Sequence, residues 1–386
     1  MDLGVAGVDH TLSHISTASN RTPFHQGAEL ILDRLSGGRR WIGLAAWSLV
    51  AAVILAAVPA ARASGTRPGS AQISAGSDGV QTIVAREFAK VAPVDPAGPA
   101  GDIGTVLEGP AFGPDGELYF VRSSARAGQP KILALDVRTR ALRTVHTDTT
   151  GVYSSVQFSP VNGLLYATDF TGAVDRMRID GSGFTYLVSG PVLGSTMVAD
   201  DLTFDKRGRF FVTDMRGDSW KTVGRVIGFD SDGHNPQLIQ GGLASPNGIS
   251  FDPEYHGLWV SEYADARELY LPLNADHTAA ADGHPALYGN VGTTQFDSNA
   301  VDLAGNLYQC IWGGGKVLVY QPEGTLIARI VVPQAVQRDE LLTTNLAIKP
   351  GANQGYLTVG GKRGGYIYTF RSPVPGGWQS NGGGPQ

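Results

Sequence analysis

The feature that most constrains the fold is one short pattern that recurs six times along the chain. Each copy consists of an apolar residue, a turn with Gly or Pro, and an apolar strand. The apolar residues before the turns are Phe112, Phe158, Phe204, Phe251, Val301 and Ile348, which lie 46, 46, 47, 50 and 47 residues apart. A blade of four short strands needs about 40–50 residues. We therefore predict an all-β fold, a six-bladed β-propeller.

Further strands in each copy complete the predicted blades. A third alternating strand follows each copy, for example KILALDV or KVLVYQ, and a turn and a fourth strand then close the blade. The six blades occupy about residues 80–374, and the last one lacks its own fourth strand. Residues 81–91 (QTIVAREFAKV) could supply it and cover the open sheet edge. A β-sandwich is the alternative, but six matches in phase disfavour it.

The segment before the propeller predicts export. Residues 41–61 carry no charge, Arg39 and Arg40 precede them, and Ala61-Arg62-Ala63 follows, which is typical of a secretory signal. The same run is long enough to span a bilayer, for which about 20 residues suffice. We expect residues 1–63 to be an extension with a cleaved signal or a membrane anchor, and the propeller to be extracytoplasmic.

Two other segments and the overall charge complete the outline. Residues 64–79 are predicted to be a Ser/Gly-rich linker, and residues 375–386 a Gly-rich disordered tail. The net charge of -5 comes without a basic stripe, so nucleic acid is not an expected partner. Nothing implies a protein partner. The single cysteine, Cys310, excludes an intrachain disulfide, and its apolar surroundings indicate a buried thiol.

Oxygen-bearing residues recur at one phase of the repeat. The residues four positions before each apolar anchor are Glu108, Ser154, Asp200, Asn247, Asp297 and Thr344. The innermost strands of a propeller all start around one mouth of the channel, so these side chains should converge there. Three carboxylates at one mouth repel unless a cation neutralises them. Oxygen ligands without His or Cys favour a hard ion, calcium rather than magnesium or zinc.

Each polar residue also has a simpler interpretation. Asp, Asn and Ser commonly cap strands and hydrogen-bond to turns. Asp169, Asp214 and Glu262, which end second strands, could line the mouth or could instead pair with loop amides. Motifs for a serine hydrolase, a zinc protease or a nucleotide-binding loop do not occur in the sequence.

Several of these segments together resemble a known family. LEGPAF, ADDLTFDKRGRFFVTDMRG, PNGISFDP and DSNAVDLAGNLYQCIWGGGKVLVYQPEG resemble the gluconolactonase and senescence-marker-protein (regucalcin-like) family. The resemblance covers about residues 104–370. Within the family the segments are most similar to the calcium-dependent drug-responsive lactonases.

The resemblance implies a set of site residues. It assigns a metal ion at the mouth to Glu108, Asn247 and Asp297, and the drug-responsive branch adds Asp200 and Ser298. It also makes Asp297 the catalytic acid and base. Asp201 adjoins Asp200, and only the repeat phase favours Asp200.

A second, structural calcium of that branch is not expected here. One of its acidic ligands would be at the position of Val192. We therefore expect one Ca²⁺ per chain, with another divalent ion as the alternative.

These expectations lead to a functional hypothesis. The chain is predicted to be a calcium-dependent hydrolase that opens lactones or related small-molecule esters, with Asp297 as acid and base. Two alternatives stay open. The same metal site could hydrolyse phosphotriesters or fluorophosphates, or the propeller could bind a ligand without catalysis.

Overall fold

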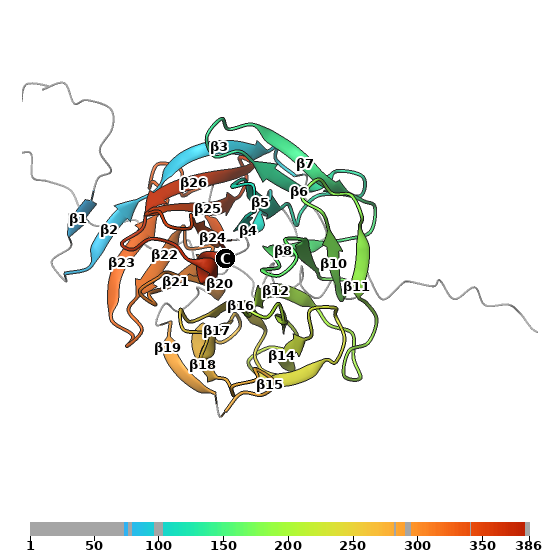
Figure 1. Ribbon diagram of the computed structural model, residues 1–386. Helices are drawn as coiled ribbons and strands as arrows, with labels where there is room; N and C mark the ends of the chain where they lie inside the picture. Colours follow the sequence, from blue (N-terminus) through green and yellow to red (C-terminus); the bar gives the residue numbers. More distant parts are fainter. Residues whose placement is uncertain are drawn as a thin grey trace, which may run out of the picture.

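A computed structural model describes residues 73–75, 79–95, 103–281, 283–289, 295–339 and 341–382. Six β-sheets form a ring around a central channel (Figure 1), which confirms the predicted six-bladed propeller. The predicted export segment 41–61 lies outside the described residues. Within them, no helix has the length and apolar character needed to cross a bilayer.

The first four strands of each of five blades run from the channel outward in chain order, and the sixth blade takes its outermost strand from the N-terminal part of the chain. The first blade comprises β4 (Glu108–Phe112), β5 (Leu118–Val121), β6 (Pro130–Leu135) and β7 (Leu142–Thr147). The second comprises β8 (Tyr153–Phe158), β9 (Leu165–Asp169), β10 (Ala173–Met177) and β11 (Thr185–Val188). The third comprises β12 (Ala199–Phe204), β13 (Phe210–Asp214), β14 (Gly224–Phe229) and β15 (Gln237–Leu243).

The remaining blades follow the same scheme. The fourth comprises β16 (Pro246–Phe251), β17 (Gly257–Glu262), β18 (Arg267–Pro272) and β19 (His284–Tyr288). The fifth comprises β20 (Gln295–Val301), β21 (Leu307–Trp312), β22 (Lys316–Tyr320) and β23 (Leu326–Val331). The sixth comprises β24 (Leu342–Ile348), β25 (Gln354–Gly360), β26 (Gly365–Arg371) and β3 (Arg86–Ala92).

The N-terminal strands join two blades, whereas the sequence predicts that residues 81–91 complete one. β3 pairs antiparallel with β26 and is the predicted fourth strand of the sixth blade. β2 (Gln81–Val84) instead pairs parallel with β23 of the fifth blade, and β1 (Ile73–Ala75), inside the predicted linker, pairs with β2. The chain crosses between blades at Ala85, which is fully buried. Burial of Ile83 between the two blades and coverage of the free β23 edge account for the split.

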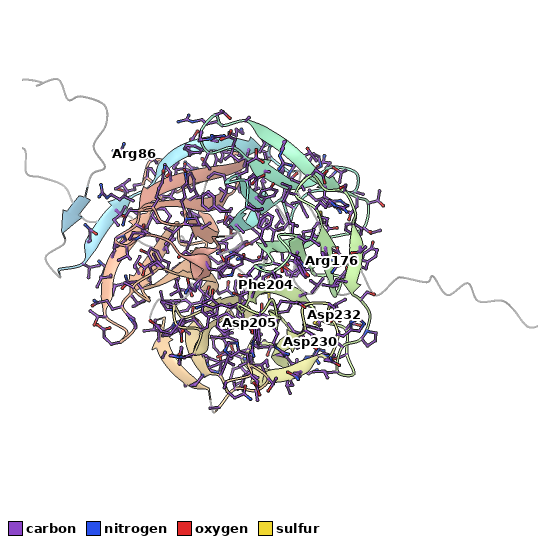
Figure 2. The ribbon with its side chains drawn as sticks, in the orientation of Figure 1. Arg86, Arg176, Phe204, Asp205, Asp230 and Asp232 are labelled. Atoms are coloured by element: carbon purple, nitrogen blue, oxygen red, sulfur yellow. The ribbon has the colours of Figure 1, made fainter. Side chains whose placement is uncertain are left out.

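The repeated apolar anchors pack between neighbouring blades. Phe204 contacts Tyr166 of the preceding blade edge-to-face, with ring centroids 5.0 Å apart, and Phe158 contacts Tyr119 in the same way at 4.9 Å. Phe204 lies near the axis, while charged Arg176 lies farther out (Figure 2). Aromatic pairs of this kind add about 0.5–1.5 kcal/mol beyond the burial of their area. The anchors therefore repeat because each closes the joint to the previous blade.

The C-terminal segment occupies the end of the channel opposite the starts of the innermost strands. A 3₁₀ helix, η1 (Trp378–Ser380), lies at the centre of the ring (Figure 1). Asn381 follows it. The Phe112 N–H donates to the Asn381 carbonyl at 2.9 Å, and Asn381 Nδ2 donates to the Leu346 carbonyl at 2.6 Å. Gln157 Nε2 donates to Asn381 Oδ1 at 2.6 Å.

The predicted disorder of residues 375–386 is therefore wrong for residues 375–382. Gln379, Ser380 and Asn381 are buried, and Trp378 packs against the cores of three blade pairs. The high glycine content lets this segment approach the strand ends closely: a Cβ at Gly376 would lie 2.3 Å from the Ile348 carbonyl oxygen. Residues 383–386 lie outside the described part of the chain.

This packing predicts that Asn381 stabilises the propeller. Asn381 has a positive φ of 56°, which glycine also adopts, so Asn381→Gly removes only the side-chain contacts. We expect a loss of about 1–3 kcal/mol in the free energy of unfolding, because buried partners are left unpaired. Denaturant unfolding measures it. Asn235→Gly, at an exposed position with φ of 51°, is the control. Equal losses in both variants would contradict the prediction.

Candidate functional site

A β-bulge interrupts every innermost strand close to the predicted polar position. In β12, Ala199 pairs with Asp214 and Leu202 with Val212, so Asp200 and Asp201 together oppose the single residue Thr213. The five other innermost strands have a register shift at the corresponding place. A bulge of this kind re-aims side chains beside functional sites. In four of the strands the shift falls on the predicted polar residue and the one after it, at positions 200–201, 247–248, 297–298 and 344–345.

Hydroxyl groups on the second strands hold these bulges. Thr213 Oγ1 accepts the Asp201 N–H at 3.0 Å and donates to the Asn247 carbonyl of the next blade at 2.6 Å. Ser261 Oγ likewise accepts the Gly248 N–H and donates to the Asp297 carbonyl, each at 2.7 Å. Each hydroxyl therefore fixes its own bulge and ties it to the following blade.

The acidic residues that end the second strands pair with loop amides. Asp169 accepts the Val152 N–H at 3.0 Å and Asp214 accepts the Val198 N–H at 2.8 Å. Glu262 accepts the Ala244 N–H at 2.7 Å. Of the two predicted interpretations, pairing with loop amides is the one that the structure confirms.

The five predicted metal ligands all lie at the same end of the propeller. Each stands at the start of an innermost strand: Glu108 in β4, Asp200 in β12, Asn247 in β16, and Asp297 and Ser298 in β20. Glu108 keeps part of its surface accessible, and the other four are buried. Ser298 Oγ donates to Asn247 Oδ1 at 3.2 Å, and the Ser298 N–H donates to Asp297 Oδ1 at 3.1 Å.

The carboxylates at this mouth perturb one another. Burial raises the pKa of Glu108 well above its usual range, and the charges of Asp297, Asp200 and Asp201 raise it further. Burial likewise raises the pKa values of Asp200 and Asp297, with Asp201 adding to both. Asp200 Oδ2 and Asp297 Oδ2 have no hydrogen-bond partner among the described residues. Such oxygens are costly to bury and typical of a site that takes a cation.

The structure adds Asp201 to the site, which the sequence did not separate from Asp200. Its Oδ1 accepts hydrogen bonds from Ser155 Oγ and from the Leu202 N–H, and its Oδ2 accepts one from Asn345 Nδ2 at 3.4 Å. Burial raises its pKa to about 6. Because both oxygens of Asp201 have protein donors, Asp200 is the better candidate ligand. Sequence reasoning missed Ser155 and Asn345 as partners of Asp201, and the bulges that place Asp201 and Asn345 have no recognised signal in the sequence.

The candidate ligands have the chemistry that a hard cation prefers, but their side chains are not arranged around a common point. The candidate ligands are all oxygens, and two of them lack a partner. No group of three or more His, Cys, Asp and Glu side chains in the described residues is arranged to hold a metal ion. Closure of these side chains around calcium therefore stays a prediction.

An arginine occupies the region where a second calcium was in question. Arg225 Nε donates to Asp214 Oδ2 at 2.7 Å, and its Nη1 donates to the Val192 carbonyl at 3.0 Å. Arg225 and Val192 are both buried. A fixed guanidinium beside Val192 would repel a cation at that position, and the number of calcium ions per chain stays a prediction.

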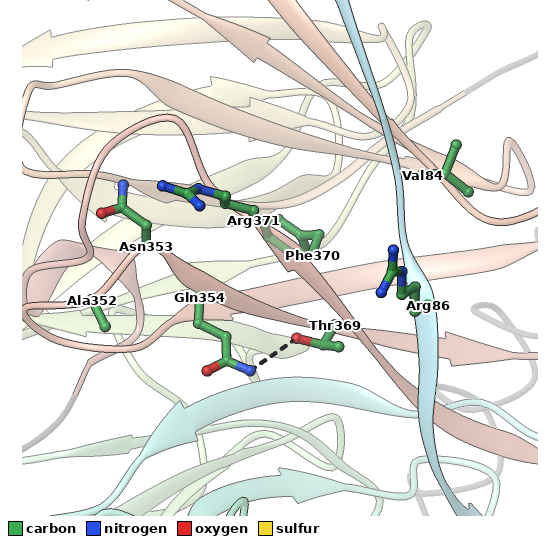
Figure 3. A pocket seen from close by; sticks show the side chains of 8 residues that line it. All are labelled: Val84, Arg86, Ala352, Asn353, Gln354, Thr369, Phe370 and Arg371. Carbon is green, nitrogen blue, oxygen red and sulfur yellow. Dashed lines mark hydrogen bonds between the residues drawn. The ribbon is translucent and has the colours of Figure 1, made fainter. Parts of the chain in front are cut away.

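Cys310 and one outer groove do not belong to the mouth's candidate ligands. Cys310 is fully buried, as predicted, and burial and the nearby carboxylates raise its pKa well above its usual value. A thiol in this state is a poor nucleophile. A groove of about 450 Å³ between β2 and the sixth blade is lined partly by Arg86, Arg371 and Gln354 (Figure 3). It lies at the ring's outer edge, by the strand ends remote from the mouth.

Comparison with known proteins places this arrangement in a family. Residues 107–339 match the model of the SMP-30/Gluconolactonase/LRE-like region. The chain belongs to this family. The matched region includes all five predicted metal ligands, so the resemblance stated from the sequence is confirmed.

Individual relatives include lactonases. The chain is 27% identical to Lactonase drp35 of Staphylococcus haemolyticus over 277 residues, which covers 70% of this chain and 83% of the relative. It is 32% identical to Lactonase drp35 of Staphylococcus saprophyticus over 213 residues, covering 54% and 65%.

Solved structures share the fold. A luciferin-regenerating enzyme aligns with a TM-score of 0.63 at 13% identity, covering 78% of this chain and 99% of that one. A calcium-binding regucalcin from Agrobacterium tumefaciens aligns with a TM-score of 0.60 at 16% identity, covering 76% and 97%. A gluconolactonase from Xanthomonas campestris aligns with a TM-score of 0.58 at 20% identity, covering 75% and 97%.

The raised pKa values predict how calcium and pH act together on stability. A carboxyl group whose folded pKa exceeds its unfolded pKa keeps its proton in the folded state, so the folded state loses stability as pH rises above about 4. Calcium binding should offset that loss. We expect calcium to raise the Tm of the chelator-treated protein at pH 7, and to raise it much less at pH 4.5, where protons compete for the carboxylates. Scanning calorimetry measures both shifts, and an equal or absent calcium shift would contradict the prediction.

Proposed function

We propose that this protein is a calcium-dependent hydrolase that opens lactones. The observation that carries the proposal is the pair of unpartnered oxygens, Asp200 Oδ2 and Asp297 Oδ2, beside Glu108 at one mouth. A propeller that only binds a protein or a neutral ligand has no need of these buried charges. Membership in a family with curated lactonases supports the choice of substrate.

Five residues of this chain would hold the ion: Glu108, Asp200, Asn247, Asp297 and Ser298. When bound, calcium supplies a fixed positive charge that polarises the ester carbonyl and stabilises negative charge on its oxygen. The Ser298 hydroxyl, which donates to Asn247 Oδ1 at 3.2 Å, and the Ser298 N–H, which donates to Asp297 Oδ1 at 3.1 Å, orient the two neighbouring ligands.

Asp297 would move the protons of the reaction. Its Oδ1 accepts the Ser298 N–H, which leaves Oδ2 without a protein partner among the described residues. We assign Oδ2 to take a proton from the attacking water as the new C–O bond forms. The ring C–O bond then breaks, and the same proton passes to the alkoxide that leaves. The product is a hydroxy acid, and Asp297 returns to its starting state.

The burial of Asp297 helps this role. A carboxylate with an ordinary pKa is a weak base at neutral pH, but burial and Asp201 both raise the pKa of Asp297. A bound cation lowers the pKa of Asp297. The opposing effects of the cation and of the surrounding carboxylates therefore determine how strong a base Asp297 is. Asp201 is one of those carboxylates, and its own oxygens stay hydrogen-bonded.

We also propose that the enzyme acts outside the cytoplasm, released or membrane-attached. The proposal rests on residues 41–61, an uncharged run behind Arg39 and Arg40. Cell fractionation tests it, and a soluble cytoplasmic pool of the full-length chain would contradict it.

Activity should depend on calcium. We expect the purified protein to hydrolyse lactones, to lose that activity in excess chelator, and to regain it when calcium is restored. The measurement is a pH-stat or dye assay over a panel of lactones, linear esters and phosphotriesters. Hydrolysis of phosphotriesters alone would replace the proposed substrate. Inactivity toward the whole panel would favour a binding propeller.

Replacement of Asp297 by Asn should separate proton transfer from ion binding. We expect Asp297→Asn to lower kcat by about 10²–10⁴-fold at saturating calcium, the usual size of an acid–base contribution. If Asp297 is only a ligand, excess calcium restores the rate and the proton role is wrong.

Asp175→Asn is the matched control for this substitution. Asp175 is also buried, and both of its oxygens lack a partner among the described residues. Burial raises its pKa to about 8, so it is largely neutral at pH 7 and resembles Asn. It lies on β10, outside the mouth, so its replacement should leave kcat unchanged.

A further inference from the structure

The side chain of Tyr263 stands at the mouth between the fourth and fifth blades. It lies two residues beyond Ser261, whose hydroxyl donates to the Asp297 carbonyl at 2.7 Å. The Tyr263 N–H donates to the Ser245 carbonyl at 2.9 Å, so the backbone stays paired beyond the end of β17. Alternate residues of a paired strand share a face. Tyr263 therefore continues the face of Ser261 toward the opening.

A second aromatic residue flanks Tyr263 across the joint between blades. Trp312 ends β21 two residues beyond Cys310, which opposes the bulge at Asp297 and Ser298. The rings of Tyr263 and Trp312 meet edge-to-face with centroids 6.5 Å apart. This contact holds the phenol ring in place beside the candidate ligands of β20.

The Tyr263 hydroxyl is buried without a partner. Tyr263 is 4% exposed, and its hydroxyl oxygen has no hydrogen bond to any described residue. Several other buried tyrosines differ, because their hydroxyls donate to protein oxygens, as in the pairs Tyr153–Asp148, Tyr166–Ser231 and Tyr308–Asp302. An unpartnered buried hydroxyl in a native fold calls for an explanation, and a role in ligand binding or catalysis is one.

The surroundings of this hydroxyl are the candidate site. The carboxylates of Asp297, Glu108 and Asp200 all lie near enough to raise the pKa of Tyr263 beyond the effect of burial. The phenol therefore keeps its proton at neutral pH and can act only as a donor or a neutral acceptor. Two oxygens of these carboxylates, Asp200 Oδ2 and Asp297 Oδ2, also lack a partner among the described residues, and they are the ones assigned to the cation and the proton.

We infer that the Tyr263 hydroxyl donates a hydrogen bond to an oxygen of the bound ester, which makes Tyr263 a further catalytic residue of the proposed lactone hydrolysis. The ring of Trp312 contacts the ring of Tyr263, and the Tyr263 hydroxyl has no acceptor among the described residues. A bound ester would supply that acceptor. The hydroxyl transfers no proton. It stabilises an oxygen that gains negative charge as the ring opens, and this stabilisation is greater in the transition state than in the bound ester.

The test compares Tyr263→Phe with Tyr308→Phe at saturating calcium. Tyr263→Phe removes only the unpartnered hydroxyl, so we expect kcat to fall about 10²-fold, KM to change little, and Tm to stay the same or rise. Tyr308→Phe removes a hydroxyl that donates to Asp302 at 3.0 Å, far from the mouth. That control should lower Tm and leave kcat unchanged. Calcium affinity, measured by calorimetry, should match the wild type in both variants.

Several results would overturn the role of Tyr263. An unchanged kcat in Tyr263→Phe, with an active wild type, refutes this residue's role and leaves the proposed function intact. A fall in Tm as large as that of Tyr308→Phe shows that the hydroxyl has a structural partner in the protein. Weaker calcium binding shows that it serves the ion rather than the ester. A wild type inactive toward every lactone and ester refutes the proposed function, and this inference falls with it.

Discussion

The candidate site depends on hydrogen bonds from second-strand hydroxyls to the bulges of neighbouring blades. Thr168 donates to the Asp200 carbonyl, Thr213 to that of Asn247, and Ser261 to that of Asp297. These three links connect the second blade to the fifth in succession. The residues whose carbonyls they fix are the ones whose side chains carry the charge or the amide at the mouth. Because the backbones of Asp200, Asn247 and Asp297 are held from the preceding blade, the ring can keep mutually repelling carboxylates in place. Replacing any of these hydroxyls would loosen a ligand without touching its side chain.

Holding these charges costs stability, and the rest of the fold has to offset it. Buried carboxylates with raised pKa values favour the unfolded state at neutral pH. The offset comes from contacts remote from the mouth. Each anchor packs on the preceding blade, as Phe251 does on Phe211 with ring centroids 5.3 Å apart. The C-terminal segment joins several blades at the other end of the channel, where Asn381 Nδ2 also reaches Asn345 Oδ1 at 3.2 Å. Asn345 in turn donates to Asp201. The C-terminal segment, at the end of the channel opposite the mouth, therefore also supports a carboxylate of the site.

The repeat in the sequence predicted the blades and the first polar residue of each innermost strand, but it did not predict the bulges or the two ends of the propeller. Six anchors in phase were sufficient for the fold, because each anchor meets the same partner in the preceding blade. The same phase located Glu108, Asp200, Asn247 and Asp297. The second bulge residue was missed, because alternation in a regular strand would turn Asp201 away from the channel and only the bulge brings it back. The N-terminal strands and the C-terminal segment have no repeat to compare with. Burial of Ile83 beside the fifth blade and of Gln379 in the channel depends on surfaces that only the folded ring provides.

Three buried acids outside the mouth pair with arginine, and the mouth differs from them. Arg122 pairs with Asp95, Arg225 with Asp214, and Arg267 with Glu262. Among the described residues, no Lys, Arg or His forms an ion pair with Glu108, Asp200, Asp201 or Asp297. An arginine there would neutralise the charge permanently and would occupy space that the proposed function reserves for a substrate oxygen. A bound ion neutralises the same charge and leaves a coordination position open. The four acids at the mouth therefore have no ion-pair partner in the part of the chain that the structure describes, which supports the proposed metal site over a structural ion-pair network.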